Sequence, residues 1–207
     1  MIRQRQFIFL AMVFLFLTAC SRQPQEVLLD SFEGVIDSKT VDFGTSKGAT
    51  QLSVSASLDQ KVCGEQSLRI SYDLKPSGYM WIARGFGLDV LGAAQWLVKP
   101  EDIKWEKFNA IVFSMYGTGS GNVIAFDLKD SGGELWRFMV DDDFRGWKEI
   151  VCPFNVFFPR TDWQPPTAER NDLIDFPIMS FQFEPKVPGQ ATYYFDCMKV
   201  SRLKIKK

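Results

Sequence analysis

The 207-residue sequence contains no histidine. A Ser-His-Asp triad, a Cys-His pair and a histidine-based zinc site all need an imidazole, so these three kinds of site are excluded. The sequence also has no excess of basic residues, because 24 Lys and Arg stand against 25 Asp and Glu. A surface that binds nucleic acid needs clustered positive charge, and we therefore expect no nucleic-acid partner.

The sequence has no apolar run long enough to cross a bilayer comfortably as a helix. The longest, Phe7–Leu17, follows Arg3 and Arg5 and has the pattern of a signal peptide. It leads into Leu17-Thr18-Ala19-Cys20, which resembles the lipobox of bacterial lipoproteins, whose cysteine is lipidated and becomes the N-terminus after cleavage. An ordinary secretory signal or a short membrane anchor is the alternative.

This pattern predicts three segments. Residues 1–19 are a lipoprotein signal peptide, residues 20–26 are a tether that begins at a lipidated Cys20, and residues 27–207 are one domain. Ser21 is not the aspartate that is linked to retention in the inner membrane. The resemblance therefore predicts a lipid anchor in the bacterial cell envelope, with the outer membrane favoured.

Cysteine is scarce in the predicted mature chain, which keeps only Cys63, Cys152 and Cys197. Disulfides form in an oxidising compartment, but an odd number leaves at least one thiol unpaired. Cys152 shares its strand face with Ile150, and we interpret it as a buried thiol. The pairing stays open.

Apolar and polar residues alternate along much of the domain, which is typical of half-buried strands. No convincing long helix is present. The expected strands are Val27–Phe32, Gln51–Leu58, Ser67–Leu74, Tyr79–Phe86, Ala110–Tyr116, Asn122–Asp130, Leu135–Val140, Trp147–Val151, Ile178–Phe183 and Thr192–Leu203. About ten strands predict an all-β domain, a two-sheet β-sandwich of the jelly-roll type.

One loop carries side chains suited to chemistry. Arg160, Asp162 and Trp163 lie within four residues, with Pro159 before them and Pro165–Pro166 after them. A guanidinium, a carboxylate and a large ring on a stiffened loop suit the binding of a sugar. The alternative is a loop whose Trp covers the core and whose Arg and Asp pair with each other.

Five segments together resemble carbohydrate-binding module family 11, which is found attached to bacterial endoglucanases and related polysaccharide hydrolases. They are LLDSFEGV at 28–35, SGYMWIARGF at 77–86, GWKEIVCPF at 146–154, PRTDWQPP at 159–166 and YYFDCMKV at 193–200. The resemblance implies a galactose-binding-domain-like jelly roll with a cleft on the concave face of one sheet. The complex I intermediate-associated family, a related jelly roll, is the competing assignment.

The resemblance implies which residues bind the sugar. Gly132 falls near a family aspartate, for which Asp130 is the nearest replacement, and Phe183 falls where the family has a tyrosine. The implied carbohydrate-binding residues are Tyr79, Asp130, Arg160, Asp162, Trp163 and Phe183. The rings would stack on sugar faces, and the charged groups would bind hydroxyls.

A second set of acids is a candidate metal site. Asp30 and Glu33 end the first strand, and Asp196 lies in the last strand, which runs beside the first in jelly-roll modules. Carboxylates together with backbone carbonyls from Gly64–Ser67 suit Ca²⁺. In the resembling family such a calcium is structural. The alternative is that these carboxylates merely end strands.

The predicted function is non-catalytic binding of β-glucan at the cell surface or in the periplasm, in support of a partner glycoside hydrolase. Family members bind polysaccharide and do not cleave it, so we expect no enzyme. The expected partners are β-glucan, the membrane through the lipid anchor, and a possible hydrolase. One alternative is a protein-interaction or assembly lipoprotein with the same sandwich. Another is a small glycosidase, which needs a pair of carboxylates at a fixed separation.

Overall fold

The structure, a computed structural model, describes residues 26–46 and 50–204. The predicted signal peptide, most of the tether and the lipidation of Cys20 lie outside the described residues. Within the described ranges, no helix is both long and apolar enough to cross a membrane.

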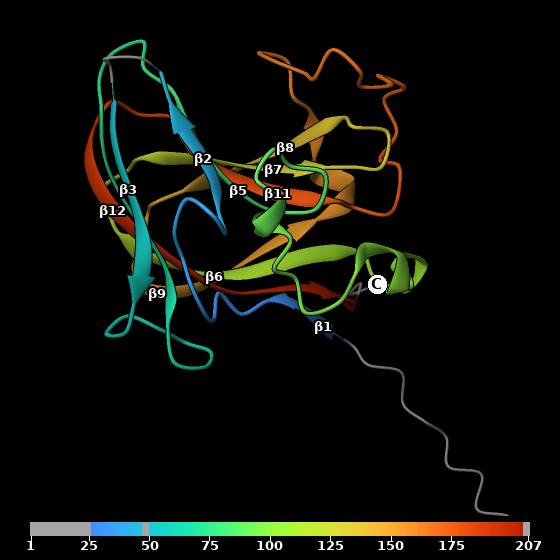
Figure 1. Cartoon of the computed structure of the whole chain (residues 1–207), viewed down its shortest axis with the longest axis horizontal. Coiled ribbons are helices and arrows are strands. Elements are labelled where there is room, and N and C mark those ends of the chain that lie inside the picture. The colour runs from blue at the N-terminus through green and yellow to red at the C-terminus, as the bar shows by residue number, and fades with distance from the viewer. Residues whose placement is uncertain (1–25, 47–49, 205–207) are drawn as a thin grey trace, which may run out of the picture.

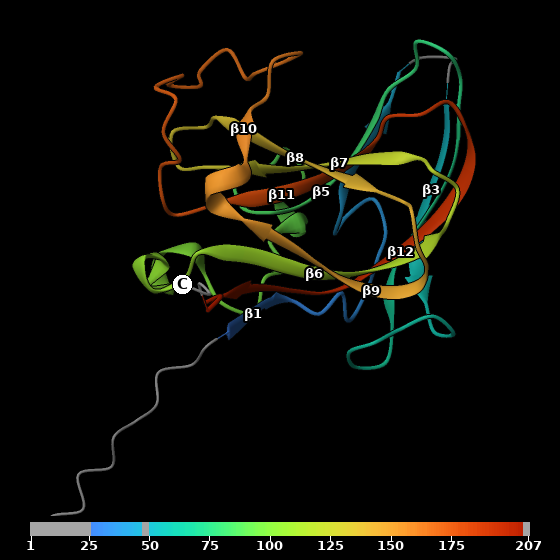
Figure 2. The same cartoon turned by 180° about the vertical axis from the view of Figure 1, so that it is seen from behind.

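Two six-stranded antiparallel sheets pack face to face (Figures 1 and 2). The first sheet has the order β3-β4-β12-β6-β9, with β1 beside the end of β12, and the second has the order β10-β8-β7-β11-β5-β2. This arrangement confirms the predicted all-β, two-sheet sandwich.

The strand bounds are β1 Glu26–Asp30, β2 Asp42–Thr45, β3 Thr50–Ser57, β4 Ser67–Leu74, β5 Met80–Gly85, β6 Ala110–Thr118, β7 Val123–Lys129, β8 Leu135–Asp141, β9 Arg145–Pro153, β10 Phe158–Pro159, β11 Ser180–Pro185 and β12 Gly189–Ser201. Short 3-10 turns are η1 Leu91–Ala93, η2 Pro100–Asp102, η3 Trp105–Lys107 and η4 Phe154–Val156.

Strand β11 shows how alternation sorts the side chains. Phe181 and Phe183 face the core, whereas Gln182 and Glu184 face outward, because successive strand residues point to opposite sides of a sheet. The ring of Phe183 stacks on Phe195 of β12, with 3.8 Å between the ring centroids, so the two sheets meet there. Each fully buried phenyl ring contributes roughly 2–3 kcal/mol to folding.

A buried ion pair joins the two sheets. The Nε of Arg84 on β5 donates to Asp30 Oδ2 at 2.7 Å, and its Nη2 donates to Asp30 Oδ1 at 3.0 Å. Both side chains are 1% exposed, and the guanidinium lies 5.4 Å from the centroid of the Phe32 ring. Removing either partner would leave the other charge buried without a counter-charge, which is strongly unfavourable. The pair therefore fixes the position of β1 relative to β5.

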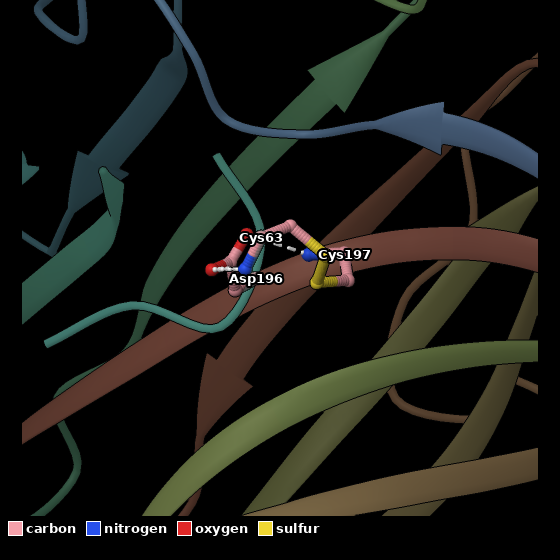
Figure 3. Close-up of side chains that lie close together, drawn as sticks. All are labelled: Cys63, Asp196 and Cys197. Carbon is pink, nitrogen blue, oxygen red and sulfur yellow. Dashed lines mark hydrogen bonds between the residues drawn. A yellow bond between two sulfur atoms is a disulfide. The ribbon is translucent and has the colours of Figure 1, made fainter. Parts of the chain in front are cut away.

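The structure pairs Cys63 with Cys197 and leaves Cys152 as a buried free thiol. The prediction for Cys152 is confirmed, and the open pairing is resolved. The disulfide ties the loop after β3 to an irregularity in β12, where Cys197 has φ of 53° and the pairing register shifts between Asp196 and Lys199 (Figure 3).

The predicted strands are found, their ends shifted by at most three residues, and β4 has the predicted bounds. Two strands were missed. β2 has four residues, one of them Gly44, and β10 has two residues, one of them Pro159. Such short segments contain too few alternations for a pattern to be recognised, and their strand geometry comes from pairing with β5 and β8.

We expect the double substitution Cys63→Ser, Cys197→Ser to lower the free energy of unfolding by about 2–5 kcal/mol, because the disulfide closes a long loop and restricts the unfolded chain. Urea denaturation measures this difference. Adding reductant should bring the unsubstituted protein to the same stability and leave the variant unchanged. Equal stability of the two proteins under oxidising conditions would contradict the prediction.

Candidate functional site: an aromatic-walled groove on one sheet

A groove of about 790 Å³ lies on the outer face of the second sheet. Its floor contains a row of paired residues that crosses four strands: Asp127 of β7 lies opposite Gln182 of β11, Gln182 lies opposite Ala83 of β5, and Ala83 lies opposite Asp42 of β2. On the other side of Asp127 the row continues to Arg137 of β8. Because these residues share one face of adjacent strands, the row is polar except at Ala83.

Asp127 is the centre of this surface. It is 0% exposed, and its Oδ1 and Oδ2 accept hydrogen bonds from Nε and Nη2 of Arg137 at 2.7 and 2.8 Å. Nη1 of Arg160 lies 3.2 Å from Oδ2 of the same carboxylate. Burial raises the pKa of Asp127, whereas the two guanidinium groups act in the opposite direction. Two cations therefore hold one buried carboxylate in place.

Glu184 links the same two arginines from β11. Its Oε2 lies 2.7 Å from Nη2 of Arg137 and 3.0 Å from Nη2 of Arg160, and its Oε1 accepts from Lys186 at 2.7 Å. Glu184 is 3% exposed. The network fixes both guanidinium planes before any ligand arrives, which reduces the entropy lost on binding.

Asp162 completes the network at the surface. Its Oδ1 accepts from Nε of Arg160 at 2.6 Å, and its Oδ2 accepts from Nη1 of Arg137 at 3.1 Å. Partial burial raises the pKa of Asp162, but the bonds and charges of Arg160 and Arg137 outweigh it and hold this pKa well below its usual range. The carboxylate is therefore charged at neutral pH, and with 46% of its side chain exposed it can still accept hydrogen bonds from a ligand.

Trp163 forms one wall of the groove. It is 55% exposed, and Arg160 lies 5.7 Å from the centroid of its ring. The loop that carries it is tied to β8, since Gln164 accepts from the backbone N–H of Leu135 at 2.7 Å and donates to the carbonyl of Leu135 at 2.8 Å. Figures 1 and 2 show this orange loop rising beyond β8 and β10. The indole is thus an exposed ring on a fastened loop.

Tyr79 and Trp81 form the other wall. Their rings stack with 6.3 Å between centroids, and Tyr79 is 55% exposed. The indole of Trp81 lies across Gly44 of β2, where a side chain would collide with it, and its Nε1 donates to Asp42 at 3.2 Å. The glycine therefore makes room for a flat ring beside the groove.

Four of the six sugar-binding residues implied by the sequence lie at the groove. Arg160, Asp162, Trp163 and Tyr79 all line it. Arg160 and Asp162 also pair with each other, as the alternative interpretation of the loop supposed, but Trp163 is exposed and does not cover the core.

Two predicted residues lie elsewhere. Phe183 is 0% exposed and packs between the sheets, because its place in β11 puts it on the inner face. Asp130 is 1% exposed, and its oxygens accept from the N–H groups of Glu134, Trp136 Nε1 and Asp175. Its role is to hold the turn after β7, so neither residue is positioned to touch a ligand in the groove.

Sequence reasoning missed Asp127, Arg137, Glu184 and Trp81. A signal was present in the alternation: Asp127 falls on the outward face of a strand whose inward residues are Ile124, Phe126 and Leu128. A charged residue in the middle of a central strand indicates a partner on the neighbouring strand. Which strand is the neighbour could not be read from the sequence.

The predicted calcium ligands are surrounded by hydrogen-bond donors; Figure 3 shows those of Asp196 that come from Cys63 and Cys197. Asp30 is bound to Arg84, Glu33 Oε1 accepts from the backbone N–H groups of Glu65 and Gln66, and Asp196 accepts from those of Val62, Cys63 and Cys197.

A cation would have to compete with these donors and, at Asp30, with a guanidinium charge. The sulfurs of Cys63 and Cys197 lie near Asp196, but they are joined in a disulfide and offer no thiolate. The arrangement does not fit Ca²⁺, and the predicted ion at Asp30, Glu33 and Asp196 stays an untested prediction.

A β-sandwich with an open groove between aromatic walls, over a polar floor, is the architecture of a carbohydrate-binding domain. The model of the carbohydrate binding domain of family 11 matches residues 19–200. The chain therefore belongs to this family of carbohydrate-binding domains. The enzyme names of its relatives come from catalytic domains to which such modules are attached.

Solved carbohydrate-binding modules of family 11 and of family 30 share the fold. The family 11 module of Clostridium thermocellum, in complex with a β-1,3-1,4-mixed-linked tetrasaccharide, has a TM-score of 0.65 at 24% identity, covering 86% of this chain and 95% of that chain. A family 30 carbohydrate-binding module of a cellulosomal cellulase from the same organism has a TM-score of 0.52 at 12% identity, covering 86% and 97%. These likenesses confirm the jelly-roll sandwich.

Two curated relatives are enzymes. Endoglucanase H of Acetivibrio thermocellus is 28% identical over 158 residues, which is 72% of this chain and 15% of the relative. Mannan endo-1,4-beta-mannosidase of Bifidobacterium adolescentis is 27% identical over 127 residues, which is 60% of this chain and 11% of the relative. The chain thus spans less than a sixth of the length of either relative.

We expect Phe183→Ala to lower the free energy of unfolding by about 3–5 kcal/mol, since it empties a site in the core. Trp163→Ala, at an exposed ring, should change it by less than about 1 kcal/mol. Chemical denaturation of both variants measures the difference. A Trp163→Ala protein as unstable as Phe183→Ala would show that the indole belongs to the core.

Proposed function

We propose that the groove binds a linear β-glucan chain. The observation that carries the proposal is the pairing of two exposed aromatic walls, Trp163 on one side and Tyr79 with Trp81 on the other, across a floor of preformed ion pairs. The faces of β-linked glucose rings are apolar and their edges carry hydroxyls. Stacked rings would remove the faces from water, while the floor would bind the edges.

The floor suits an uncharged ligand. Asp127, Asp162 and Glu184 are matched by Arg137, Arg160 and Lys186, so the groove carries no large net charge. Arg160 presents a planar donor, and Asp162 an acceptor, beside the exposed face of Trp163. Vicinal hydroxyls of a neutral sugar can donate to the carboxylate and accept from the guanidinium.

The glucan assignment is supported by relatives. A family 11 module of similar fold was solved with a β-1,3-1,4-mixed-linked tetrasaccharide, and one curated relative is an endoglucanase. Another relative is named for mannan, so β-mannan is the competing ligand to be measured beside β-glucan.

The envelope location is part of the proposal. The lipobox-like sequence that ends at Cys20 predicts a lipid anchor, and the Cys63–Cys197 disulfide suits an oxidising compartment. An anchored domain without catalysis would hold β-glucan at the cell envelope for a partner glycoside hydrolase. The alternative, a protein-binding lipoprotein, predicts no retention on any glycan.

Affinity electrophoresis of the purified protein tests the ligand. We expect retardation on barley β-glucan or lichenan and weaker or no retardation on β-mannan. Unretarded migration of folded protein on every glycan would overturn the proposal. Stronger retardation on β-mannan than on β-glucan would make β-mannan the ligand in place of β-glucan.

Trp163→Ala should weaken glucan binding at least tenfold, about 1.4 kcal/mol, because it removes one stacking wall. Trp147→Ala is the matched control: this indole packs on Tyr116 of the other sheet, far in the fold from the groove residues. Isothermal titration calorimetry with a soluble mixed-linkage oligosaccharide measures both. An equal loss in the two variants would argue against Trp163 as a contact.

Cys20→Ala should move the protein from the membrane fraction to the soluble fraction when it is expressed in a bacterial cell, since the acylated thiol would be lost. Cys152→Ala, which alters a buried thiol, is the control and should leave the protein in the membrane fraction. Immunoblots of the separated fractions measure the distribution. Membrane association of Cys20→Ala would contradict lipidation at this residue.

A further inference from the structure

Strand β2 lies at one edge of the second sheet, beside β5 (Figure 1). It has only four residues, and within the part of the chain that the structure describes, β5 is the only strand that pairs with it. Three residues that alternate along the chain nevertheless contact the wall formed by Tyr79 and Trp81. They are Asp42 and Gly44 in the strand and Ser46 directly after it, and alternation places them on the same side of the sheet.

Gly44 receives the indole of Trp81, which lies directly opposite it on β5. A methyl group placed on Gly44 would collide with Cη2, Cζ2 and Cζ3 of the six-membered ring. The indole therefore occupies the space in which a side chain at residue 44 would lie. Because β2 and β11 lie on opposite sides of β5, the ring leans over β2 and away from the centre of the groove.

Asp42 fixes the rotation of the same ring. Its Oδ1 accepts a hydrogen bond from Nε1 of Trp81 at 3.2 Å. This bond ties the five-membered ring of the indole to β2, while Gly44 makes room for the six-membered ring. The two contacts together select one orientation for a side chain that could otherwise turn about its own bonds.

Ser46 holds the other ring of the wall through the backbone. Its N–H donates to the carbonyl of Tyr79 at 2.9 Å, and its Oγ accepts from the N–H of Tyr79 at 3.2 Å. The ring of Tyr79 stacks on that of Trp81, with an angle of 21° between the two ring planes. Both rings of this wall are thus positioned by β2 and the residue that follows it.

The attachment of β2 to the sandwich uses the other side of the strand. The side chain of Phe43, between Asp42 and Gly44, packs against the core. A change at Asp42 or Gly44 therefore alters the groove side of the strand and leaves its core contact in place. Asp42 also lines the groove, so it could act on a ligand directly as well as through Trp81.

We propose that β2 sets the width of the groove, with Gly44 and Asp42 as positioning residues for Trp81. A side chain at residue 44 would turn the indole away from β2 and toward the floor of the groove, where it would narrow the space for a ligand. The effect on glycan binding rests on the proposed function, whereas the effect on the ring does not.

The position of the ring can be tested without any glycan. In two-dimensional proton–nitrogen NMR spectra each indole N–H gives its own signal, and the signal of Trp81 is the one missing from Trp81→Phe. We expect Gly44→Ala and Asp42→Ala to shift this signal, because the first displaces the ring and the second removes its acceptor. Asp42→Ala keeps the proposal testable should Gly44→Ala fail to fold.

Thr45→Ala is the matched control for these spectra, because Thr45 lies on the same strand but on its opposite face. It should leave the Trp81 signal in place. An unmoved Trp81 signal in both Gly44→Ala and Asp42→Ala, or an equal shift in Thr45→Ala, would overturn the proposal.

Calorimetric titration with a soluble mixed-linkage oligosaccharide tests the consequence for binding. We expect Gly44→Ala and Asp42→Ala each to weaken binding by at least about fivefold. Asp42→Asn should retain most of the affinity, since an amide oxygen can also accept from the indole N–H. In a Trp81→Ala background, Gly44→Ala and Asp42→Ala should cause no further loss, because residues that act through one ring are not additive.

A further loss of affinity in the Trp81→Ala background would show that the residues act on the ligand directly, and it would overturn their positioning role. The two proposals can fail separately. If the unsubstituted protein bound no glycan while Gly44→Ala still shifted the Trp81 signal, the proposed glycan function would be refuted and the positioning of the ring by β2 would stand.

Discussion

The buried carboxylate of Asp127 is the constraint on which the groove depends. It lies on the outward face of a central strand, where an isolated charge without exposure to water would be strongly unfavourable. Arg137 and Arg160 compensate it from β8 and from the loop after β10, and Glu184 joins both arginines from β11. Three separate segments are thereby held at one place, and the loop that bears Trp163 is one of them.

The aromatic walls depend on the sandwich in a different way. Trp81 can lie flat beside the groove because Gly44 offers no side chain beneath it, and Tyr79 stacks on Trp81 in turn. Across the groove, the side chain of Gln164 forms hydrogen bonds with both the N–H and the carbonyl of Leu135, as the backbone of a neighbouring strand would. These bonds fix the base of the loop. The groove thus combines exposed rings with a loop whose base is held by hydrogen bonds.

The sequence predicted the sandwich and part of the site for identifiable reasons. Alternation marks strands of seven or eight residues such as β4, and the stiffened loop marks Arg160, Asp162 and Trp163 as a unit. The same reasoning misplaced Phe183, because a ring matched to a family position was assigned by motif although its parity in β11 points inward. It also grouped Asp30, Glu33 and Asp196 by their strand positions without knowing that N–H donors and Arg84 surround them.

The sequence by itself determined that this protein is an all-β sandwich with an inward-facing Cys152, no imidazole chemistry and a rigid loop of mixed aromatic and charged residues. Those properties follow from composition and from contacts between near neighbours. Only the tertiary structure decided that Cys63 bonds to Cys197 and that Asp127 holds two arginines. These contacts join residues far apart in the chain, and strand order, which no local pattern encodes, brings them together.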